Sequence, residues 1–346
     1  LLFDFPTQEE AILETCPDLY TLMKKLFLQL FKEKVLNDRM DHKDLLIGIV
    51  FLLQSTVGIL GNFSLLFCYL IHYYTEQTLK TTDLLLTHLF TANSLIILSK
   101  GFLYTMGAFG IKDFINDFGC KFLMYIARLG RGMSIGTTCL LSVFQAITLS
   151  PGNSFGLCLK VKAPKHIGLF TSLCWIHYMS VNIIFPMYKY NKGNSNNLTR
   201  KSDMRYCSTS GHDDFTSSLY TALFVLPEIL FSVIIVWSTS SMIITLYRHK
   251  QRVQHIRSTR VSSRTSPESK ATYRIMALVS TFIGFYALSS ILQGLIALIY
   301  NPGWWLMNIN AIVSMCFPTL GPFVMKRNSK THNLTTEKTK KKQLKG

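Results

Sequence analysis

Seven long apolar runs divide the sequence and decide its fold class. A bilayer core about 30 Å thick needs about 20 apolar residues at a helical rise of 1.5 Å. Strands of a membrane barrel would be about 10 residues long and would alternate in polarity, unlike these runs. Because lipid offers backbone amides no hydrogen-bond partner, each run predicts a spanning helix. The predicted fold is all-α, a seven-transmembrane helix bundle with spans near 45–72, 82–107, 120–147, 166–188, 216–247, 272–299 and 305–325.

Composition supports a membrane protein. Of the 346 residues, 49% are hydrophobic and only 16% are charged, which is too apolar for ordinary soluble domains. The net charge of +17 alone would suggest nucleic acid, but the apolar runs separate the basic residues instead of leaving one basic patch. We therefore predict membrane lipid as a partner, no nucleic acid, and a multi-pass protein of the plasma membrane.

The distribution of Lys and Arg between alternate loops predicts the orientation. The loops at Lys80 and 160–165, the segment 248–274 and the tail after Met325 hold 20 basic residues. The opposite loops, 108–121, 189–215 and 300–304, hold 7. Basic residues accumulate on the cytoplasmic side of a membrane. The N-terminus is therefore expected outside and the C-terminus inside.

Two covalent modifications are expected on the outer side. Asn197 opens an Asn-Leu-Thr acceptor for glycosylation in the loop between the fourth and fifth spans, whereas Asn62 and Asn333 head similar tripeptides inside a span and in the inner tail. Cys120 begins the third span and Cys207 lies in the outer loop, so an oxidising compartment would pair them. The alternative is two free thiols. The other cysteines are expected to behave as small apolar residues in or near helices, and the role of Cys16 is left open.

The two ends of the chain flank the predicted helix bundle of 45–325. Within residues 1–44, apolar positions recur at helical spacing over 19–36, which predicts an amphipathic helix on the membrane or over the bundle. Equally, this stretch could precede the true start, since Met40 stands just before the first span. With no secretory leader in sight, the first span is expected to act as the targeting signal. The lysine-rich segment 326–346 is expected to be a disordered cytoplasmic tail.

Several helix landmarks resemble those of rhodopsin-like G-protein-coupled receptors. They are Gly61 and Asn62 in the first span, Trp175 in the fourth and Pro227 in the fifth. Other landmarks of that superfamily are missing: Asp-Arg-Tyr after the third span, Cys-Trp-x-Pro in the sixth and Asn-Pro-x-x-Tyr in the seventh.

The motifs at those places resemble the type 1 vomeronasal (pheromone) receptors over about residues 45–326. The third span ends in TTCLLSVFQAITLSP at 137–151, and the third inner loop reads YRHKQRVQHIRST at 247–259, followed by Ser266-Pro267-Glu268. The seventh span carries FPTLGPF at 317–323. The extended N-terminus departs from the short one usual in that family.

Charged residues inside the spans need partners or water because lipid does not solvate them. Arg131 lies 11 residues after Cys120, about 16 Å deep at helical rise, and Glu228 lies about 12 residues into the fifth span, about 18 Å deep. We therefore predict that Arg131 and Glu228 form an intramembrane ion pair. It either orients helices only or also takes part in switching; Glu228→Gln should lower surface expression or shift basal signalling.

A ligand pocket is expected between the helices nearer the outer surface, at the level of Lys100 and Arg128, about 7 to 8 residues from that surface. Ten residues are candidates for its lining, although aromatic and Met residues at helical spacing usually pack instead: Lys100, Tyr104, Met124, Tyr125, Ala127, Arg128, Arg131, Tyr286, Gln293 and Asn310. Asn93 stands where most rhodopsin-like receptors have Asp, so regulation by sodium should be weak. Asn93 with Asn62 is expected to form a hydrogen-bonded contact between helices.

The family resemblance implies binding of a small hydrophobic pheromone-like molecule and activation of an inhibitory-type heterotrimeric G protein. The residues expected to face that protein are Phe144, Gln145, Arg248, His249, Lys250, Arg252, His255 and Arg257. No enzyme activity, cofactor or metal is expected, since no phosphate loop, nucleophile with its base or metal-spaced cluster is found. A decayed, non-signalling receptor copy is the main alternative; a transporter fits less well because the halves do not repeat.

Overall fold

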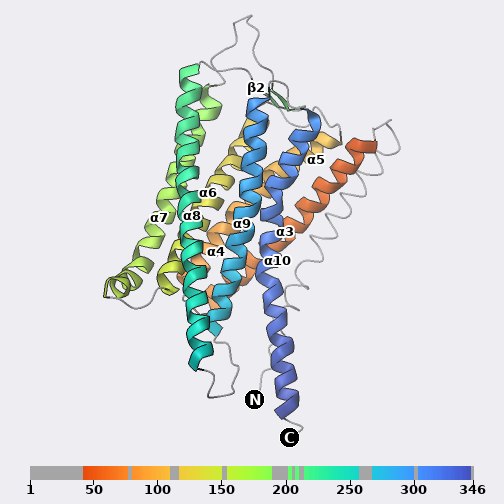
Figure 1. Ribbon diagram of the computed structural model, residues 1–346. Helices are drawn as coiled ribbons and strands as arrows, with labels where there is room; N and C mark the ends of the chain where they lie inside the picture. The colour runs from red at the N-terminus through yellow and green to blue at the C-terminus, as the bar shows by residue number, and fades with distance from the viewer. Residues whose placement is uncertain are drawn as a thin grey trace, which may run out of the picture.

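The computed structural model describes residues 42–76, 80–109, 117–149, 154–188, 202–204, 207–209, 214–256, 267–299 and 303–343. Long helices make up nearly all of this part of the chain (Figure 1). They are α3 (His42–Glu76), α4 (Thr81–Ile96) continued by the π-helical turn η1 (Ile97–Gly101) and by α5 (Phe102–Ala108), α6 (Asp117–Leu149), α7 (Ser154–Tyr188), α8 (Asp214–Ile256), α9 (Pro267–Leu298) and α10 (Trp304–Gln343). A short hairpin joins β1 (Ser202–Met204) and β2 (Cys207–Thr209), with Asp203 opposite Ser208.

These helices confirm the predicted bundle. Among the described residues, six stretches are long and apolar enough to cross a membrane. The 35-residue helix α7 is the seventh long helix and covers the predicted fourth span. The six stretches are His42–Tyr74, Thr81–Ala108, Phe118–Leu149, Val225–Arg248, Arg274–Ile296 and Trp304–Met325.

Helix α6 lies at the centre of the bundle. It contacts α4, α7, α8, α9, η1 and strand β2. In its most apolar stretch 61% of the residues are buried, against 22% for α8, which therefore lies on the outside. The main core cluster gathers around α6 and includes Leu89 and Phe90 of α4, Met133 and Ile135 of α6, and Phe282 of α9.

Glycines let α4 and α7 approach α6 closely on two sides. A Cβ on Gly130 would lie 2.8 Å from the carbonyl oxygen of Ala92 and 2.9 Å from Cγ1 of Ile96, both in α4. On another face, a Cβ on Gly132 would overlap the ring of Tyr178 in α7. Small residues at helix interfaces are the usual means of close packing in membranes, where burial of apolar surface from lipid gains little.

Asn62 connects α3 to a point of α10 where a backbone hydrogen bond is missing. Pro322 has no N–H to donate, so the carbonyl of Pro318, four residues earlier, loses its helical partner. The Asn62 Nδ2 donates to this carbonyl at 2.9 Å and to Gly58 O at 2.7 Å. Gly61 lies directly against Pro322, which lets the two helices come near enough for this bond. The side chain of Asn62 thus replaces a missing backbone donor.

The structure corrects two expectations about non-helical segments. Helix α10 continues to Gln343, so most of the tail expected to be disordered is helical. Likewise α8 runs on to Ile256 and α9 begins at Pro267, which shortens the inner loop expected over 248–274. In both segments Lys, Arg, Glu and Gln are good helix formers and no proline interrupts the continuing helix. The amphipathic helix expected over 19–36 lies outside the described residues.

A disulfide bond fixes the start of α6. Cys120 is disulfide-bonded and buried. Strand β2, which begins at Cys207, contacts α6. The hairpin lies at the end of the bundle opposite the end of α10 (Figure 1). Cys139, Cys174 and Cys316 are free thiols among the described residues.

Candidate functional site

A polar cluster joins three helices in the middle of the bundle. Arg131 of α6 places its Nε 3.4 Å from Oε1 of Glu228 in α8, and only 11% and 12% of these side chains are exposed. The structure thus brings together the two charges whose depths along their helices match. Glu228 directly follows Pro227, the proline inside α8.

Tyr286 of α9 contacts both members of the ion pair. Its hydroxyl donates to Oε2 of Glu228 at 2.5 Å. The guanidinium carbon of Arg131 lies 4.6 Å from the centre of its ring, a cation–π distance. Each carboxylate oxygen of Glu228 therefore accepts one bond, and Tyr286 connects α9 to α6 and α8 at the same point.

Two serines of α9 complete the surroundings of the guanidinium. Arg131 donates through Nη1 to Ser289 Oγ and through Nη2 to Ser290 Oγ, each at 3.1 Å. Gln293, one turn further along α9, donates to Ser289 Oγ at 3.4 Å. Because a guanidinium has five N–H donors in a fixed plane, it can bind α8 and α9 at once.

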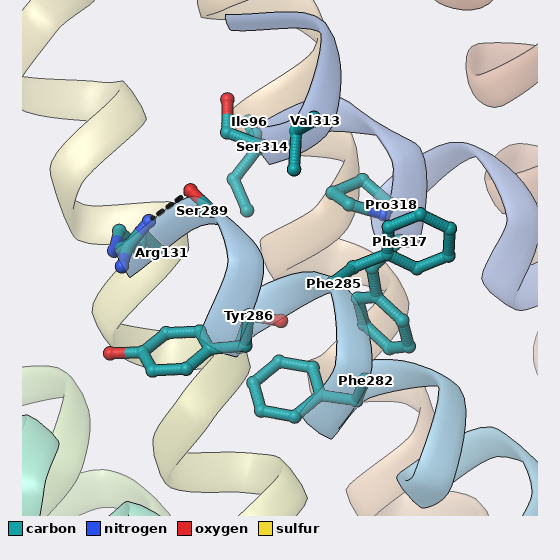
Figure 2. Close-up of a pocket in the computed structure, with 11 residues that line it drawn as sticks. Ile96, Arg131, Phe282, Phe285, Tyr286, Ser289, Val313, Ser314, Phe317 and Pro318 are labelled. Carbon is teal, nitrogen blue, oxygen red and sulfur yellow. Dashed lines mark hydrogen bonds between the residues drawn. The ribbon is translucent and has the colours of Figure 1, made fainter. Parts of the chain in front are cut away.

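A cavity of about 30 Å³ adjoins this cluster between α4, α6, α9 and α10. Figure 2 shows Arg131 and Ser289 at one edge of it and aromatic rings along another. The volume suffices for one or two water-sized groups. Its lining consists of Ile96, Arg131, Ser134, Phe282, Phe285, Tyr286, Ser289, Val313, Ser314, Phe317 and Pro318.

Lys100 of η1 bonds to Ser314, a serine that lines this cavity. Its Nζ donates to Ser314 Oγ at 2.9 Å, and Ser314 in turn donates to the carbonyl of Ala311 at 2.8 Å. A π-helical turn carries one more residue than an α-helical turn and occurs frequently at functional sites. The wide turn Ile97–Gly101 therefore helps to aim Lys100 at α10.

The candidate lining residues divide into two groups. Arg131 and Tyr286 line the cavity, and Lys100 and Gln293 each bond to one of its serines. The rings of Tyr104 and Phe51 lie 5.1 Å apart, so Tyr104 packs in a separate apolar cluster. The cavity lining does not include Met124, Tyr125, Ala127, Arg128 or Asn310, although the buried Oδ1 of Asn310 accepts no described hydrogen bond.

The contact expected between Asn62 and Asn93 is corrected. Asn93 Oδ1 accepts from Ser134 Oγ of α6 at 3.2 Å, whereas Asn62 donates to α10. Each amide connects a different pair of helices, and the described hydrogen bonds include none between the two. The reason is local, because the carbonyl of Pro318 needs a donor and the hydroxyl of Ser134 faces α4.

The residues expected at the inner surface are described only in part. Arg248 of α8 is exposed. Gln145 is buried, and Phe144 packs against the main core, so neither side chain is freely presented here. The side chains of His249, Lys250, Arg252 and His255 lie outside the described residues, as do Arg257 and the glycosylation candidate Asn197.

Replacing Tyr286 with Phe should lower the free energy of unfolding by about 1.5–3 kcal/mol, the range for a hydrogen bond to a charged group. The ring that supports Arg131 would remain, so the change isolates the hydroxyl bond to Glu228. Thermal unfolding of the purified receptor in micelles measures the effect. Tyr104→Phe is the matched control, because the described hydrogen bonds include none from its hydroxyl. Equal effects of the two changes would contradict the assignment.

The side chains of this site suit recognition of a small molecule. Among the described residues, no group of three or more His, Cys, Asp or Glu side chains is placed to hold a metal ion. The cavity joins cationic and hydroxyl groups at one edge to phenyl rings at another. Small-molecule sites typically have such a mostly apolar wall with a few placed polar groups.

Comparison with known proteins places this geometry in a receptor family. Residues 45–334 match the model of the vomeronasal organ pheromone receptor family. The chain is 50% identical to human vomeronasal type-1 receptor 2 over 79% of its length and 69% of that protein. It is 49% identical to human vomeronasal type-1 receptor 4 over 81% of its length and 92% of that protein.

A solved structure supports the fold. The crystal structure of squid rhodopsin superposes with a TM-score of 0.57 at 16% identity, covering 80% of this chain and 79% of rhodopsin. Identity this low informs on the fold alone, a seven-helix bundle. The match over most of the spans and the identity to the human receptors carry the conclusion that the chain belongs to the vomeronasal organ pheromone receptor family of G-protein-coupled receptors.

Proposed function

We propose that the chain binds a small hydrophobic, pheromone-like molecule between its helices and activates an inhibitory-type heterotrimeric G protein. Family membership makes it a chemosensory, multi-pass membrane receptor and not an enzyme. The observation that carries the proposal is the cluster of Arg131, Glu228 and Tyr286, which connects α6, α8 and α9 beside a cavity.

The cluster offers a physical route from ligand to inner surface. Any separation of α9 from α8 must break the bond between Tyr286 and Glu228 or move Arg131 away from Ser289. A ligand that binds one helix arrangement better than the other shifts the population toward it. Because Ser289 lines the cavity, a group bound there competes directly for contacts that hold α9. The ion pair is therefore assigned to switching as well as to orientation.

The proposed topology puts the N-terminus outside and the tail inside. The excess of basic residues in alternate loops supports it. The disulfide at Cys120 and the contact of β2 with α6 support pairing of Cys120 with Cys207 in the outer compartment. In this scheme Asn197 carries the glycan, residues 1–44 are the outer segment, 45–325 the receptor domain and 326–346 the inner tail.

Nucleotide exchange on purified G proteins tests the proposal. The receptor, reconstituted in lipid nanodiscs, is combined with inhibitory, stimulatory or phospholipase-coupled heterotrimers and a panel of small hydrophobic molecules. At least one molecule should accelerate exchange on the inhibitory type by roughly tenfold or more, as a 1.4 kcal/mol shift in the active population gives. The exposed Arg248 should contribute, so Arg248→Glu should reduce exchange while leaving ligand-induced thermal stabilisation intact.

Two results would contradict the proposal in different ways. Exchange on another heterotrimer alone would overturn the inhibitory assignment and keep the receptor function. Failure of every molecule with every heterotrimer, in a receptor that is folded by thermal unfolding, would favour the decayed receptor copy.

A further inference from the structure

Tyr178 of α7 carries a buried hydroxyl with no described partner. Only 1% of the residue is exposed, and among the described residues no atom forms a hydrogen bond with its Oη. A buried polar group without a hydrogen bond costs more free energy than a formed bond gains, and the cost grows where packed helices and lipid exclude water. The hydroxyl therefore needs a reason, because phenylalanine would fill the same space without this cost.

The ring of Tyr178 is fixed beside the ion pair of Arg131 and Glu228. It packs against Gly132, the residue after Arg131, so closely that a Cβ on Gly132 would overlap it. The hydroxyl interacts electrostatically with Glu228 and with Tyr286. Helix α7 also contacts both α6 and α8, the helices that carry the ion pair. The hydroxyl therefore lies within electrostatic reach of the carboxylate but makes no bond to it in this arrangement of the helices.

The carboxylate of Glu228 has described donors on α6 and α9. Arg131 contacts Oε1 at 3.4 Å, and the hydroxyl of Tyr286 donates to Oε2 at 2.5 Å. When α9 moves away from α8, the bond from Tyr286 breaks and leaves a buried oxygen without its donor. Rotation about the side-chain bonds of Glu228 can turn this oxygen toward α7, whereas the ring of Tyr178 is held against Gly132. An unpaired donor is thus already in place on α7.

We propose that Tyr178 is the alternative hydrogen-bond donor to Glu228: the carboxylate accepts from Tyr286 while α9 is packed in the bundle, and from Tyr178 once α9 has moved. The unpaired hydroxyl raises the free energy of the first arrangement, and its bond to a charged acceptor lowers that of the second. Both effects favour the second arrangement. The inference rests on the movement of α9 in the proposed function and adds a residue that does not line the cavity.

A double-mutant cycle between Tyr178→Phe and Tyr286→Phe tests the proposal. Thermal unfolding of the full chain in micelles measures the ratio of folded to unfolded receptor. With Tyr286 present, Tyr178→Phe removes only an unpaired hydroxyl, so the ratio should stay the same or rise. In the Tyr286→Phe receptor, Tyr178 should donate to Glu228, and Tyr178→Phe should then lower the ratio roughly tenfold. The fall caused by Tyr286→Phe alone should lie at the lower end of its expected range, because Tyr178 replaces part of the lost bond.

Tyr104→Phe is the matched control for the cycle. It also removes a tyrosine hydroxyl for which no hydrogen bond is described, but in a separate apolar cluster, so its effect should be equal in both backgrounds. Nucleotide exchange provides a second measurement in case Tyr286→Phe does not fold. Tyr178→Phe alone should slow the exchange stimulated by a molecule that is active on the native receptor, roughly tenfold and without loss of stability.

Other results would overturn the inference. An equal loss from Tyr178→Phe in both backgrounds would make the hydroxyl a constant structural partner, and no loss in either would show that it does not replace Tyr286. Unchanged or faster exchange in a stable Tyr178→Phe receptor would show that the hydroxyl does not favour the displaced arrangement of α9. The stability cycle uses neither ligand nor G protein, so it can reject this role of Tyr178 while the proposed function stands, and its result holds for a receptor that activates no heterotrimer.

Discussion

Replacing Glu228 with alanine should destabilise the receptor by about 3–5 kcal/mol, the cost of leaving a buried partner charge unpaired. Arg131 would lose the carboxylate at 3.4 Å, and the hydroxyl of Tyr286 would lose its acceptor. Thermal unfolding in micelles and the amount of receptor at the cell surface both measure this effect. Leu230→Ala, at an exposed position of the same helix, is the matched control and should cost much less.

The double variant Arg131→Ala with Glu228→Ala separates pairing from simple loss of packing. Removing the second charge should restore part of the stability lost in Glu228→Ala, because no isolated charge then remains. Glu228→Gln should be milder than Glu228→Ala, since the amide oxygen can still accept from Tyr286. Strictly additive losses in the double variant would show that the two side chains do not act as a pair.

Substitution of Gly130 should be one of the most damaging changes among the described glycines. A Cβ there would lie 2.8 Å from the backbone oxygen of Ala92, which cannot rotate away. Gly130→Ala should cost about 1–3 kcal/mol by overpacking. Gly130→Leu should abolish surface expression, because α4 and α6 would have to separate along their contact. Expression is measured by labelling an outer epitope on intact cells.

Gly168 provides the matched control on α7. It is exposed, and a Cβ there would meet nothing within 4 Å. Gly168→Ala should therefore leave stability unchanged or raise it by up to about 1 kcal/mol, the difference in helix propensity. If Gly130→Ala behaved like Gly168→Ala, the close approach of α4 to α6 would be wrong at this point.

The features that depend on distance along a helix could be predicted from the sequence. Seven apolar runs of spanning length fixed the bundle, because membrane thickness sets the length of a span. The constant rise per residue gave similar depths for Arg131 and Glu228, which lie 3.4 Å apart in the structure. The depth of a side chain in the membrane follows from the number of residues between it and the end of its span. For Arg131 that number was counted from Cys120, and for Glu228 from the start of the fifth span.

The direction in which a side chain points around its helix could not be counted in this way. In lipid, both the packed and the exposed faces of a helix are apolar, so the pattern does not show which face turns inward. Tyr104 and Tyr125 were therefore predicted to line the pocket, whereas Phe282 and Phe317, which do line the cavity, were not. One signal was overlooked. The guanidinium of Arg131 needs more acceptors than Glu228 provides, and Ser289 with Ser290 is a polar pair at the required depth.

The wide turn at Ile97–Gly101 has a consequence for comparing members of this family. It holds one residue more than a regular turn, so every position after it is rotated by about 100° relative to an uninterrupted helix. In a relative that lacks the extra residue, a different position of this helix would face the residue equivalent to Ser314. Deleting a single amino acid between 97 and 101 would therefore rotate the following helix, α5, about its axis and change the cavity lining more than most substitutions do.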